Sequence, residues 1–577
     1  MEKNFKELSG SFEHELVDRD GESPFAGDSL EQKLSSTVIK DLVFDSREVK
    51  PGSLFFALPG THTTGNVFVA SAIEKGAVAI IFQDSFTEDE KSKINSAIEK
   101  CGSSPLFVKV KNSRFAMSPV SAAFYDNPSE KLVVYGVTGT EGKSSTVSFI
   151  WQLLRLSGIK AGFISTVQYS LGGEAVANPQ HQTTPEATIV QRELYEMVQN
   201  GCTHAVVESS SHGLSPRTNR LGDVLFDCGI FMNVTLEHLE FHGTYEQYRD
   251  DKANLFRALD RHSHEKTIGG KKTVVPSFAI ANLEDPAFTY FASCTKKETF
   301  GFTTFGKAGR HATEKSDAKL PEIPSGINYV EASEIVPTES GLSFKISFHG
   351  ENCGIYRDIY IEENTSVKSN LPGAFNTYNI MASLVAVGGT CKIKMDSLVP
   401  LVEKIIPVKG RMTEIHRGQP FEVIVDYAHT PSSFETIFPP IRKRCKGKMI
   451  SLFGSGGERD LTKRPLQGEI AARFCDMVIL TDEDPRGEDS MELLEMIAVG
   501  ARKGGKIDGK NLLMIPDRPQ AIRKAFSLAE EGDIVLLLGK AHENSIIYKD
   551  HQIKYDEISE AEKALSEMGF SKTEVEK

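Results

Sequence analysis

The chain has 577 residues, too many for one hydrophobic core, and this length predicts about three or four domains. Hydrophobic residues make up 40% and charged residues 25% of the chain, as is ordinary for a soluble globular protein. The net charge of −13 argues against a general nucleic-acid-binding protein, because phosphate contacts need a basic surface. A small anionic ligand such as a nucleotide remains compatible with this charge, since its site needs only a few local cations.

Three features predict where the protein works. Its eight cysteines are scattered without a Cys-x-x-Cys pair, which is typical of free thiols in a reducing compartment. Residues 1–34 are acidic and polar, so we expect a flexible extension without a secretion signal. No stretch reaches the roughly 18 apolar residues that a membrane-spanning helix needs. We therefore expect a cytoplasmic protein without a membrane span.

Short apolar runs alternate with helical stretches from Val38 onward, which predicts an α/β fold. In a first block, residues 35–130, we expect strands at residues 54–58, 77–82 and 106–110. The order of strands and helices implies mostly parallel sheets.

A second block, residues 131–409, opens with the apolar strand Lys131–Val137. Further strands are expected at residues 203–207 and 228–233. Residues 261–370 are patchier, with an antiparallel-looking run at residues 342–348, and we interpret them as an elaboration of the second block.

A third block, residues 410–577, carries four apolar runs, each followed by a loop and a helix-like segment. This repeated order predicts a mostly parallel sheet. The expected strands lie at residues 421–426, 448–453, 477–480 and 533–538.

A glycine-rich loop follows the strand Lys131–Val137 and precedes a helical stretch. Glycines allow the backbone to turn tightly toward phosphate oxygens, and the next helix adds its N-terminal dipole. Lys143 can bridge the β- and γ-phosphates of ATP, and Ser144 offers a hydroxyl to Mg²⁺. The loop differs from the general Walker pattern, because Val137 stands where that pattern has its first glycine. Its residues are Thr138, Gly139, Thr140, Glu141, Gly142, Lys143, Ser144 and Ser145.

Two further strands lead into residues that are able to bind a metal ion. Glu208 follows the strand at residues 203–207, and His238 comes shortly after the strand at residues 228–233. Ligands of open parallel sheets bind beyond the carboxyl ends of the strands. We therefore expect Glu208 and His238 beside the glycine-rich loop, where they would hold Mg²⁺.

Motifs in a fixed order along the chain resemble the Mur ligase family. They include Asp45-Ser46-Arg47, the glycine-rich loop, Thr183-Thr184-Pro185, Glu208 with Ser210-Ser211-His212, His238 to Gly243, Lys252, Phe375-Asn376, Gly410-Arg411-Met412, Asp426 to Pro431, Asp484-Pro485-Arg486 and Gly539 to Glu543. The resemblance is strongest to members that add the third residue of the cell-wall peptide. It covers nearly the whole chain from about residue 38.

The resemblance implies an α/β fold of three domains. These are an N-terminal UDP-muramoyl-peptide-binding domain at residues 35–130, a central P-loop ATPase-like domain with a parallel sheet at residues 131–409, and a C-terminal Rossmann-like domain for the amino acid at residues 410–577. It also implies an ATP-dependent ligase that forms an amide bond through an acyl phosphate, with ATP and Mg²⁺ as cofactors. The partners would be UDP-N-acetylmuramoyl-L-alanyl-D-glutamate and a free amino acid.

Site roles follow from the same resemblance. Asn376, Asn379, Arg411, Asp426 and His429 would join the loop at ATP. Ser46, Thr183, Thr184, Ser211 and Arg220 would contact the UDP-muramoyl peptide, with Arg217 as the alternative arginine. Lys252 would be carbamylated and would bind Mg²⁺ with Ser144, Glu208 and His238. The catalytic set would be Lys143, Glu208, His238 and Lys252.

The incoming amino acid is expected to contact Asp484, Arg486, Gly539 and Glu543. Glu483-Asp484 replace a more usual Asp-Asn pair before Pro-Arg, which makes the pocket more acidic. That charge favours an L-diamino acid with only an amine at its far end, lysine or ornithine. Arg486 leaves meso-diaminopimelate as the alternative, because a guanidinium can bind a second carboxylate.

Two other classes of protein share part of this pattern. Folyl- or cyanophycin-type ligases share the second and third blocks, but Asp45-Ser46-Arg47 argues against both. A catalytically silent nucleotide-binding partner in wall synthesis is disfavoured because Lys143, Ser144, Glu208, His238 and Lys252 are all present.

Overall fold

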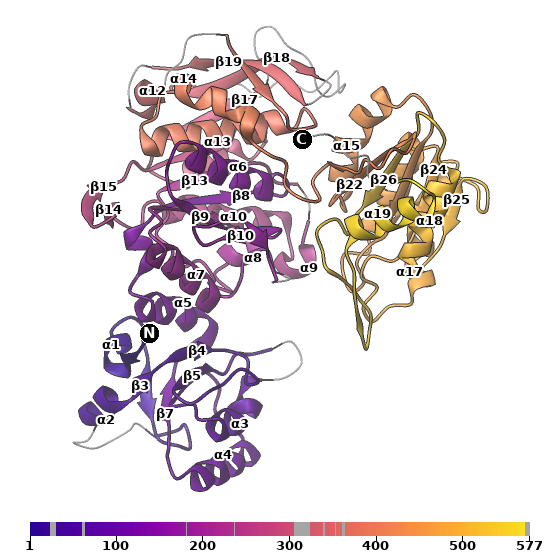
Figure 1. Cartoon of the computed structure of the whole chain (residues 1–577). Helices are drawn as coiled ribbons and strands as arrows, with labels where there is room; N and C mark the ends of the chain where they lie inside the picture. Colours follow the sequence, from indigo (N-terminus) through magenta and orange to yellow (C-terminus); the bar gives the residue numbers. More distant parts are fainter. Residues whose placement is uncertain are drawn as a thin grey trace.

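The computed structural model describes residues 1–23, 30–60, 64–179, 182–235, 237–304, 324–338, 341–351, 354–359 and 364–571. Three mostly parallel sheets follow one another along the chain, each with helices packed on it (Figure 1). The C-terminal sheet lies beside the central one, and the N-terminal sheet lies at the opposite end from β18 and β19. This is the three-domain α/β fold that the sequence predicts.

The N-terminal domain has a five-stranded sheet in the order β2-β7-β6-β5-β4, in which β2 pairs antiparallel to β7 and the other pairs are parallel. One face of its buried apolar strands forms a core with α5, the other face forms a second core with α3 and α4, and α5 packs against α7 of the central domain. The elements are β1 (Lys3–Asn4), α1 (Phe5–Ser9), β2 (Glu15–Val17), α2 (Leu30–Ser36), β3 (Val38–Ile39), β4 (Asp41–Val43), β5 (Ser53–Phe56), η1 (Gly65–Phe68), α3 (Val69–Glu74), β6 (Ala79–Phe82), α4 (Glu88–Cys101), β7 (Leu106–Lys109), α5 (Ser113–Phe124) and η2 (Pro128–Lys131).

The expectation of a flexible extension at residues 1–34 is wrong for the described part of that segment. β1 pairs with β3, and β2 forms the edge of the five-stranded sheet. Phe5 and Leu8 are fully buried in the domain core. A few well-placed apolar residues hold this acidic segment in the fold, a signal that overall composition hides.

The central domain is built on an eleven-stranded sheet in the order β11-β10-β9-β12-β8-β13-β16-β17-β18-β19-β20. Strands β9, β12, β8, β13, β16, β17 and β18 are parallel, and all six residues of β8 are buried. The elements are β8 (Val133–Thr138), α6 (Lys143–Leu156), β9 (Ala161–Ile164), β10 (Gln168–Ser170), β11 (Val176–Ala177), α7 (Ala187–Gln199), β12 (His204–Glu208), α8 (Ser211–Leu214), β13 (Cys228–Phe231), α9 (Leu239–His242), α10 (Tyr245–Ala258), β14 (Glu265–Ile268), β15 (Lys271–Val274), β16 (Phe278–Asn282), α11 (Phe288–Ser293), β17 (Thr299–Thr303), β18 (Tyr329–Pro337), β19 (Leu342–His349), α12 (Gly354–Ile359), β20 (Thr365–Ser369), α13 (Asn376–Cys391), α14 (Met395–Leu398) and η3 (Val399–Lys404).

Strands from residues 261–370 continue this central sheet. β16, β17 and β18 extend its parallel part, and β19 and β20 add an antiparallel edge. α13 packs against α6, the helix that follows the glycine-rich loop. The segment thus belongs to the central domain.

The C-terminal domain has a six-stranded sheet in the order β21-β22-β26-β23-β24-β25, in which only β21 runs antiparallel among the described strands. The elements are β21 (Thr413–Glu414), β22 (Glu422–Asp426), α15 (Pro431–Arg444), β23 (Met449–Phe453), α16 (Lys463–Phe474), β24 (Met477–Leu480), α17 (Ser490–Lys503), β25 (Leu512–Met514), α18 (Arg518–Leu528), β26 (Ile534–Leu538), β27 (Ser545–Ile547), β28 (Gln552–Lys554) and α19 (Glu557–Glu567).

Cysteine pairing and membrane spans were also predicted from the sequence. The seven cysteines within the described residues are free thiols, and Cys353 lies outside that part of the chain. Among the described helices, none combines the length and apolar character that crossing a bilayer requires.

Candidate active site

The glycine-rich loop connects the end of β8 to the first turn of α6, as the sequence predicts. Gly142 has φ +82°, and a Cβ added there would lie 2.8 Å from Asn379 Oδ1, so both backbone angle and space favour glycine. Lys143 Nζ donates to the Thr140 carbonyl at 2.7 Å. The Thr140 and Glu141 amides donate to Asn233, at 2.9 Å to its carbonyl and 2.8 Å to its Oδ1. Phosphate binding would thus fall to the amides at the start of α6.

Glu208 lies at the carboxyl end of β12, next to β8 in the sheet. The residue is 1% exposed, and its carboxylate accepts from Ser144 Oγ at 3.0 Å and from the Thr166 amide at 2.9 Å. The Ser165 hydroxyl donates to the same group. The predicted proximity of Glu208 to the loop is therefore found.

Lys252 reaches the other side of the loop from α10. It is 1% exposed, its Nζ donates to the Gly139 carbonyl at 2.7 Å, and it lies 4.4 Å from the centre of the Tyr248 ring. Burial, with the nearby positive charge of Lys143, places the pKa of Lys252 well below its ordinary value. A lowered pKa favours the neutral amine, the form that is able to react with carbon dioxide.

His238 sits at the start of α9 with φ +57°. Its ring nitrogens lie 3.6 Å from Glu237 and 3.4 Å from Glu240. Within the described part of the chain, no ion pair or hydrogen bond joins His238 to Glu208 or Lys252. Of the four predicted metal-binding residues, Ser144 and Glu208 are in direct contact, Lys252 touches the loop, and His238 faces a different pair of carboxylates.

Asn376 and Asn379 lie on the first turn of α13, beside α6. Thr146 Oγ1 donates to Asn379 Oδ1 at 3.2 Å, and Asn379 Nδ2 donates to Asn376 Oδ1 at 2.9 Å. These hydrogen bonds fix both amides next to the first turn of the phosphate-loop helix.

The C-terminal domain contacts the loop through several polar side chains. Arg411 donates to Ser144 Oγ at 3.5 Å, and Thr430 Oγ1 donates to Glu141 Oε1 at 3.3 Å. His429 Nε2 lies 3.6 Å from Glu237. Burial lowers the pKa of His429, but the Glu237 carboxylate outweighs this effect and the pKa is raised.

Asp426 ends β22 beneath these contacts. Its carboxylate accepts from the Met412 amide at 2.7 Å and from the Ala428 amide at 2.8 Å. Burial raises the pKa of Asp426 in spite of the nearby Arg411. Asp426 therefore holds together the two segments that carry Arg411 and His429.

Thr184 and Arg220, two of the residues expected at the UDP-muramoyl peptide, contact each other. Thr184 Oγ1 donates to the Glu208 carbonyl at 2.8 Å, and Arg220 donates to the Thr184 carbonyl at 2.9 Å and to Glu186 at 2.8 Å. Arg217 instead donates to the Phe241 carbonyl at 2.8 Å and lies over the Phe241 ring. Arg220 is therefore the arginine that lies against Thr184.

The remaining residues of this set are divided between two domains. Ser211 begins α8 and is 2% exposed, and Thr183 precedes Thr184. Ser46 belongs to the N-terminal domain, where its carbonyl accepts from Lys75 at 2.7 Å. A substrate contacting all of them would span both domains.

Asp484 and Glu543, expected to read the incoming amino acid, share a buried lysine. Lys540 Nζ donates to Asp484 Oδ1 at 2.8 Å and forms an ion pair with Glu543. Tyr427 OH donates to Glu543 Oε1 at 3.2 Å. The single Lys540 ammonium therefore offsets only one of these two carboxylate charges.

Arg486 and Glu483 retain unpaired polar atoms in the same region. Arg486 Nε and Glu483 Oε2 are buried without a hydrogen-bond partner among the described residues. Gly539 has φ +95°, and a Cβ there would lie 2.8 Å from Glu483 Oε2. Both side chains thus keep hydrogen-bonding capacity that no described residue uses.

Comparisons with known proteins identify the family. Models of the Mur ligase family catalytic domain, the Mur ligase middle domain and the Mur ligase glutamate ligase domain match residues 38–125, 137–387 and 410–541. A UDP-N-acetylmuramyl-tripeptide synthetase of Treponema denticola is 51% identical, over 92% of this chain and 94% of that protein. The chain belongs to the Mur ligase family. Mur ligases of this kind are ATP-dependent enzymes that form amide bonds.

Two further proteins are similar to this Mur ligase. A UDP-N-acetylmuramoyl-L-alanyl-D-glutamate–2,6-diaminopimelate ligase of Geobacillus thermodenitrificans is 35% identical, over 91% of this chain and 94% of that protein. A solved structure of a ligase with the same name has a TM-score of 0.56 at 23% identity, covering 99% of this chain and all of that one. The structural similarity supports the three-domain fold.

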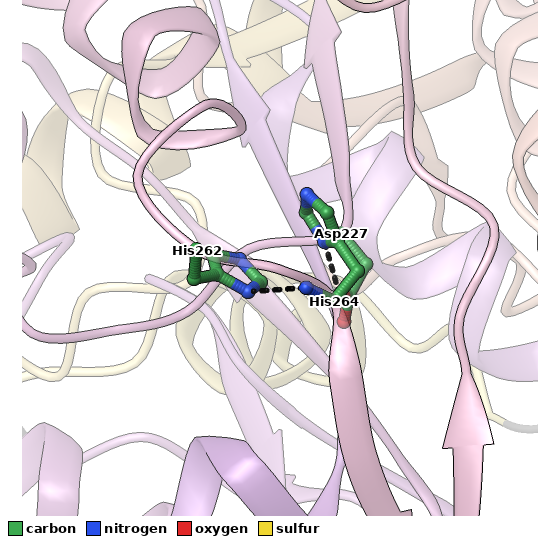
Figure 2. Close-up of side chains that lie close together, drawn as sticks. All are labelled: Asp227, His262 and His264. Carbon is green, nitrogen blue, oxygen red and sulfur yellow. Dashed lines mark hydrogen bonds and ion pairs between the residues drawn. The ribbon is translucent and has the colours of Figure 1, made fainter.

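A second group of potential metal ligands lies at the amino ends of the central parallel strands, at the opposite end from the glycine-rich loop. Asp227, His262 and His264 approach one another at the start of β13 (Figure 2), whereas the phosphate loop follows the end of β8. Lys266 Nζ donates to Asp227 Oδ2 at 2.6 Å, and His264 Nε2 lies 2.8 Å from the Leu259 carbonyl. The Lys266 ammonium on the Asp227 carboxylate would repel a cation, so we interpret these residues as a buried structural cluster, here called the polar clamp.

Three residues in contact with the site were absent from the expected set. Glu237 pairs with His429, Asn233 caps the loop amides, and Lys540 bridges Asp484 and Glu543. Glu237 stands directly before His238, and Lys540 lies between Gly539 and Glu543. Their position next to predicted site residues was the signal in the sequence that could have identified them. What they contact depends on the fold, which local sequence does not show.

Proposed function

We propose that this Mur ligase adds one amino acid to UDP-N-acetylmuramoyl-L-alanyl-D-glutamate during peptidoglycan precursor synthesis. The names of its relatives support this substrate. The observation that carries the proposal is Glu208, whose carboxylate accepts from Ser144 of the phosphate loop while its carbonyl accepts from Thr184. One residue thus adjoins both the nucleotide site and the proposed peptide site.

The chemistry follows from this arrangement. A D-glutamyl carboxylate attacks the γ-phosphate of ATP, giving an acyl phosphate and ADP, and the incoming amine then attacks the acyl carbon and expels phosphate. Lys143 and the N-terminus of α6 offset the charge that gathers on the transferred phosphoryl group. The C-terminal domain, in contact with the loop through Arg411 and Thr430, would exclude water from the acyl phosphate.

The residues at the loop fit Mg²⁺, which prefers oxygen ligands. The Ser144 hydroxyl and the Glu208 carboxylate supply two, and a Lys252 carbamate would supply a third close to Gly139. When bound, Mg²⁺ offsets phosphate charge and orients the γ-phosphate. The buried amine of Lys252, whose lowered pKa favours the uncharged form, supports its carbamylation. Among the described residues His238 makes its ion pairs with Glu237 and Glu240 and none with these oxygen ligands.

For the incoming amino acid we propose an L-diamino acid, with lysine or ornithine favoured. Lys540 offsets only one of the two charges on Asp484 and Glu543, and Glu483 adds a third carboxylate, so the acidity of this region supports a distal ammonium on the substrate. Arg486 would then bind the α-carboxylate. In meso-diaminopimelate two carboxylates would have to share this guanidinium.

Phosphate release tests the whole proposal. Purified enzyme with ATP, UDP-muramoyl dipeptide and an amino acid should release phosphate, and omission of the dipeptide should abolish it. Equal release without the dipeptide would contradict the proposed substrate, and no release in the complete mixture would favour a silent nucleotide-binding partner.

A comparison of kcat/KM for lysine, ornithine and meso-diaminopimelate identifies the amino acid that is added, since a preference of about tenfold corresponds to about 1.4 kcal/mol. The cytoplasmic location stays a prediction.

A further inference from the structure

A buried line of hydrogen bonds runs from α10 to the first residue of α8. His242 Nδ1 lies 2.8 Å from Asp251 Oδ2, and His242 Nε2 lies 3.0 Å from Ser211 Oγ. The exposed fractions are 2% for Ser211, 4% for His242 and 0% for Asp251. Three polar side chains buried to this extent are held by one another rather than by water.

The direction of these hydrogen bonds is fixed from the Asp251 end. Gln247 Nε2 donates to Asp251 Oδ1 at 2.9 Å, which leaves Oδ2 to accept from His242. A carboxylate only accepts, so the proton on the histidine ring must reside on Nδ1. In the neutral ring Nε2 is then an acceptor, and the Ser211 hydroxyl donates to it.

Because the Ser211 hydroxyl donates its proton to His242, its oxygen can only accept a hydrogen bond from any other partner. Ser211 follows Ser210, whose hydroxyl lies 2.9 Å from Thr184 Oγ1, so it belongs to the proposed peptide site. Asp251 directly precedes Lys252 on α10. The line therefore connects the helix that carries Lys252 with Ser211, the neighbour in sequence of the serine that contacts Thr184.

We propose that Asp251 and His242 are positioning residues that hold the Ser211 oxygen as an acceptor for an N–H group of the substrate's peptide. The inference rests on the proposed function, which assigns Ser211 to the UDP-muramoyl peptide. The same order of side chains activates a nucleophile in serine hydrolases. In this ligase ATP would activate the acyl group, so the line of side chains would instead orient the Ser211 hydroxyl for substrate binding.

The isosteric variant Asp251→Asn tests the direction of the line. Gln247 would hold the carbonyl oxygen of the substituted side chain, so its amide nitrogen would donate to His242 Nδ1 and force the ring proton onto Nε2. Ser211 would then accept from the ring and lose its fixed orientation toward the substrate. We expect KM for UDP-muramoyl dipeptide to rise about tenfold, the equivalent of one hydrogen bond, while KM for ATP and for the amino acid stays unchanged.

The matched control is Asp250→Asn on the same helix. Asp250 pairs with Arg257 at 2.5 Å on the partly exposed side, so this variant should keep the wild-type KM values. Gln247→Ala changes an exposed side chain and removes only the orientation of Asp251, so it should raise the same KM more weakly. This second variant keeps the test informative if Asp251→Asn folds poorly.

Ser211→Ala separates the outcomes. If the line acts through Ser211, the double variant Ser211→Ala with Asp251→Asn should bind the dipeptide no worse than Ser211→Ala alone. Full additivity would overturn the proposal and assign Asp251 a role through Lys252 or the fold. An unchanged KM for the dipeptide in Ser211→Ala would show that Ser211 is not part of the peptide site. A raised KM in Ser211→Ala together with a wild-type KM in Asp251→Asn would refute only the positioning role of Asp251 and His242.

Discussion

Ser144 Oγ donates to the Glu208 carboxylate at 3.0 Å, which ties the first turn of α6 to the end of β12. The hydroxyl and the carboxylate that were expected to bind one metal ion thus already lie in contact. The phosphate loop, the proposed metal ligands and the start of the proposed peptide site consequently form one connected unit.

Lys143→Ala should abolish ADP formation, because the γ-phosphate loses the ammonium expected to neutralise it. The described hydrogen bond of Lys143 Nζ goes to the Thr140 carbonyl of its own loop, so circular dichroism should remain that of the wild type. Lys296→Ala, at an exposed surface position, is the control. Near-normal turnover of Lys143→Ala would refute the nucleotide site.

Lys252→Ala should be nearly inactive and should recover in part with added short-chain carboxylic acids. Such an acid would replace the negative oxygen ligand that the carbamate provides, whereas an ammonium would repel Mg²⁺. Turnover with and without acetate or propionate is the measurement. Absence of any recovery, or full activity of the variant, would contradict carbamylation.

Lys540→Met should change amino-acid preference rather than nucleotide use. Without the Lys540 ammonium, the Asp484 and Glu543 carboxylates repel a second substrate carboxylate. We expect kcat/KM for meso-diaminopimelate to fall by about tenfold more than that for lysine. Asp484→Asn should act in the opposite direction, and equal losses for both amino acids would show that Lys540 only supports the fold.

Lys266→Met should lower the free energy of unfolding by about 3–5 kcal/mol, because it leaves the buried Asp227 carboxylate without its ammonium. Denaturant titration measures this change, and Lys271→Met on the neighbouring exposed strand is the control. Turnover per folded molecule should persist, since the clamp lies across the sheet from the loop. A loss below about 1 kcal/mol would contradict the clamp, as would stabilisation by added Zn²⁺.

Acid should destabilise the fold partly through His204. Burial lowers the pKa of His204 to about 4, against about 6.5 in an unfolded chain. Between these two values the unfolded state binds more protons, so stability is fully present above about pH 6.5 and declines as pH falls toward 4. The Tm of His204→Gln should fall less steeply over this interval, and parallel Tm curves for variant and wild type would count against the assignment.

The sequence predicted the apolar strands well because buried parallel strands are continuous apolar runs. The run at residues 477–480 coincides with β24, and the run at residues 228–233 ends two residues beyond β13. The prediction of a flexible extension at residues 1–34 was wrong for the opposite reason. Phe5 and Leu8 are isolated apolar residues in an acidic stretch, and only their burial against the N-terminal sheet reveals them as core.

The candidate site was predictable where motif and backbone geometry coincide, as at Gly142 and Glu208. Contacts between distant segments were not. The Lys540 ion pairs offset part of the acidity that favours a diamino acid, and they depend on β26 lying near the Asp484 loop.

Two polar contacts at 3.3 and 3.5 Å join the C-terminal domain to the glycine-rich loop, and His429 lies 3.6 Å from Glu237 of the central domain. Long polar contacts of this kind contribute little to stability, so we expect the domain to change orientation at little cost in free energy. A nucleotide that met Lys143 on one side and Arg411 on the other would bind one orientation better than the rest. Nucleotide occupancy would then set the population of the compact form, and release of products would return the domain to its broader ensemble.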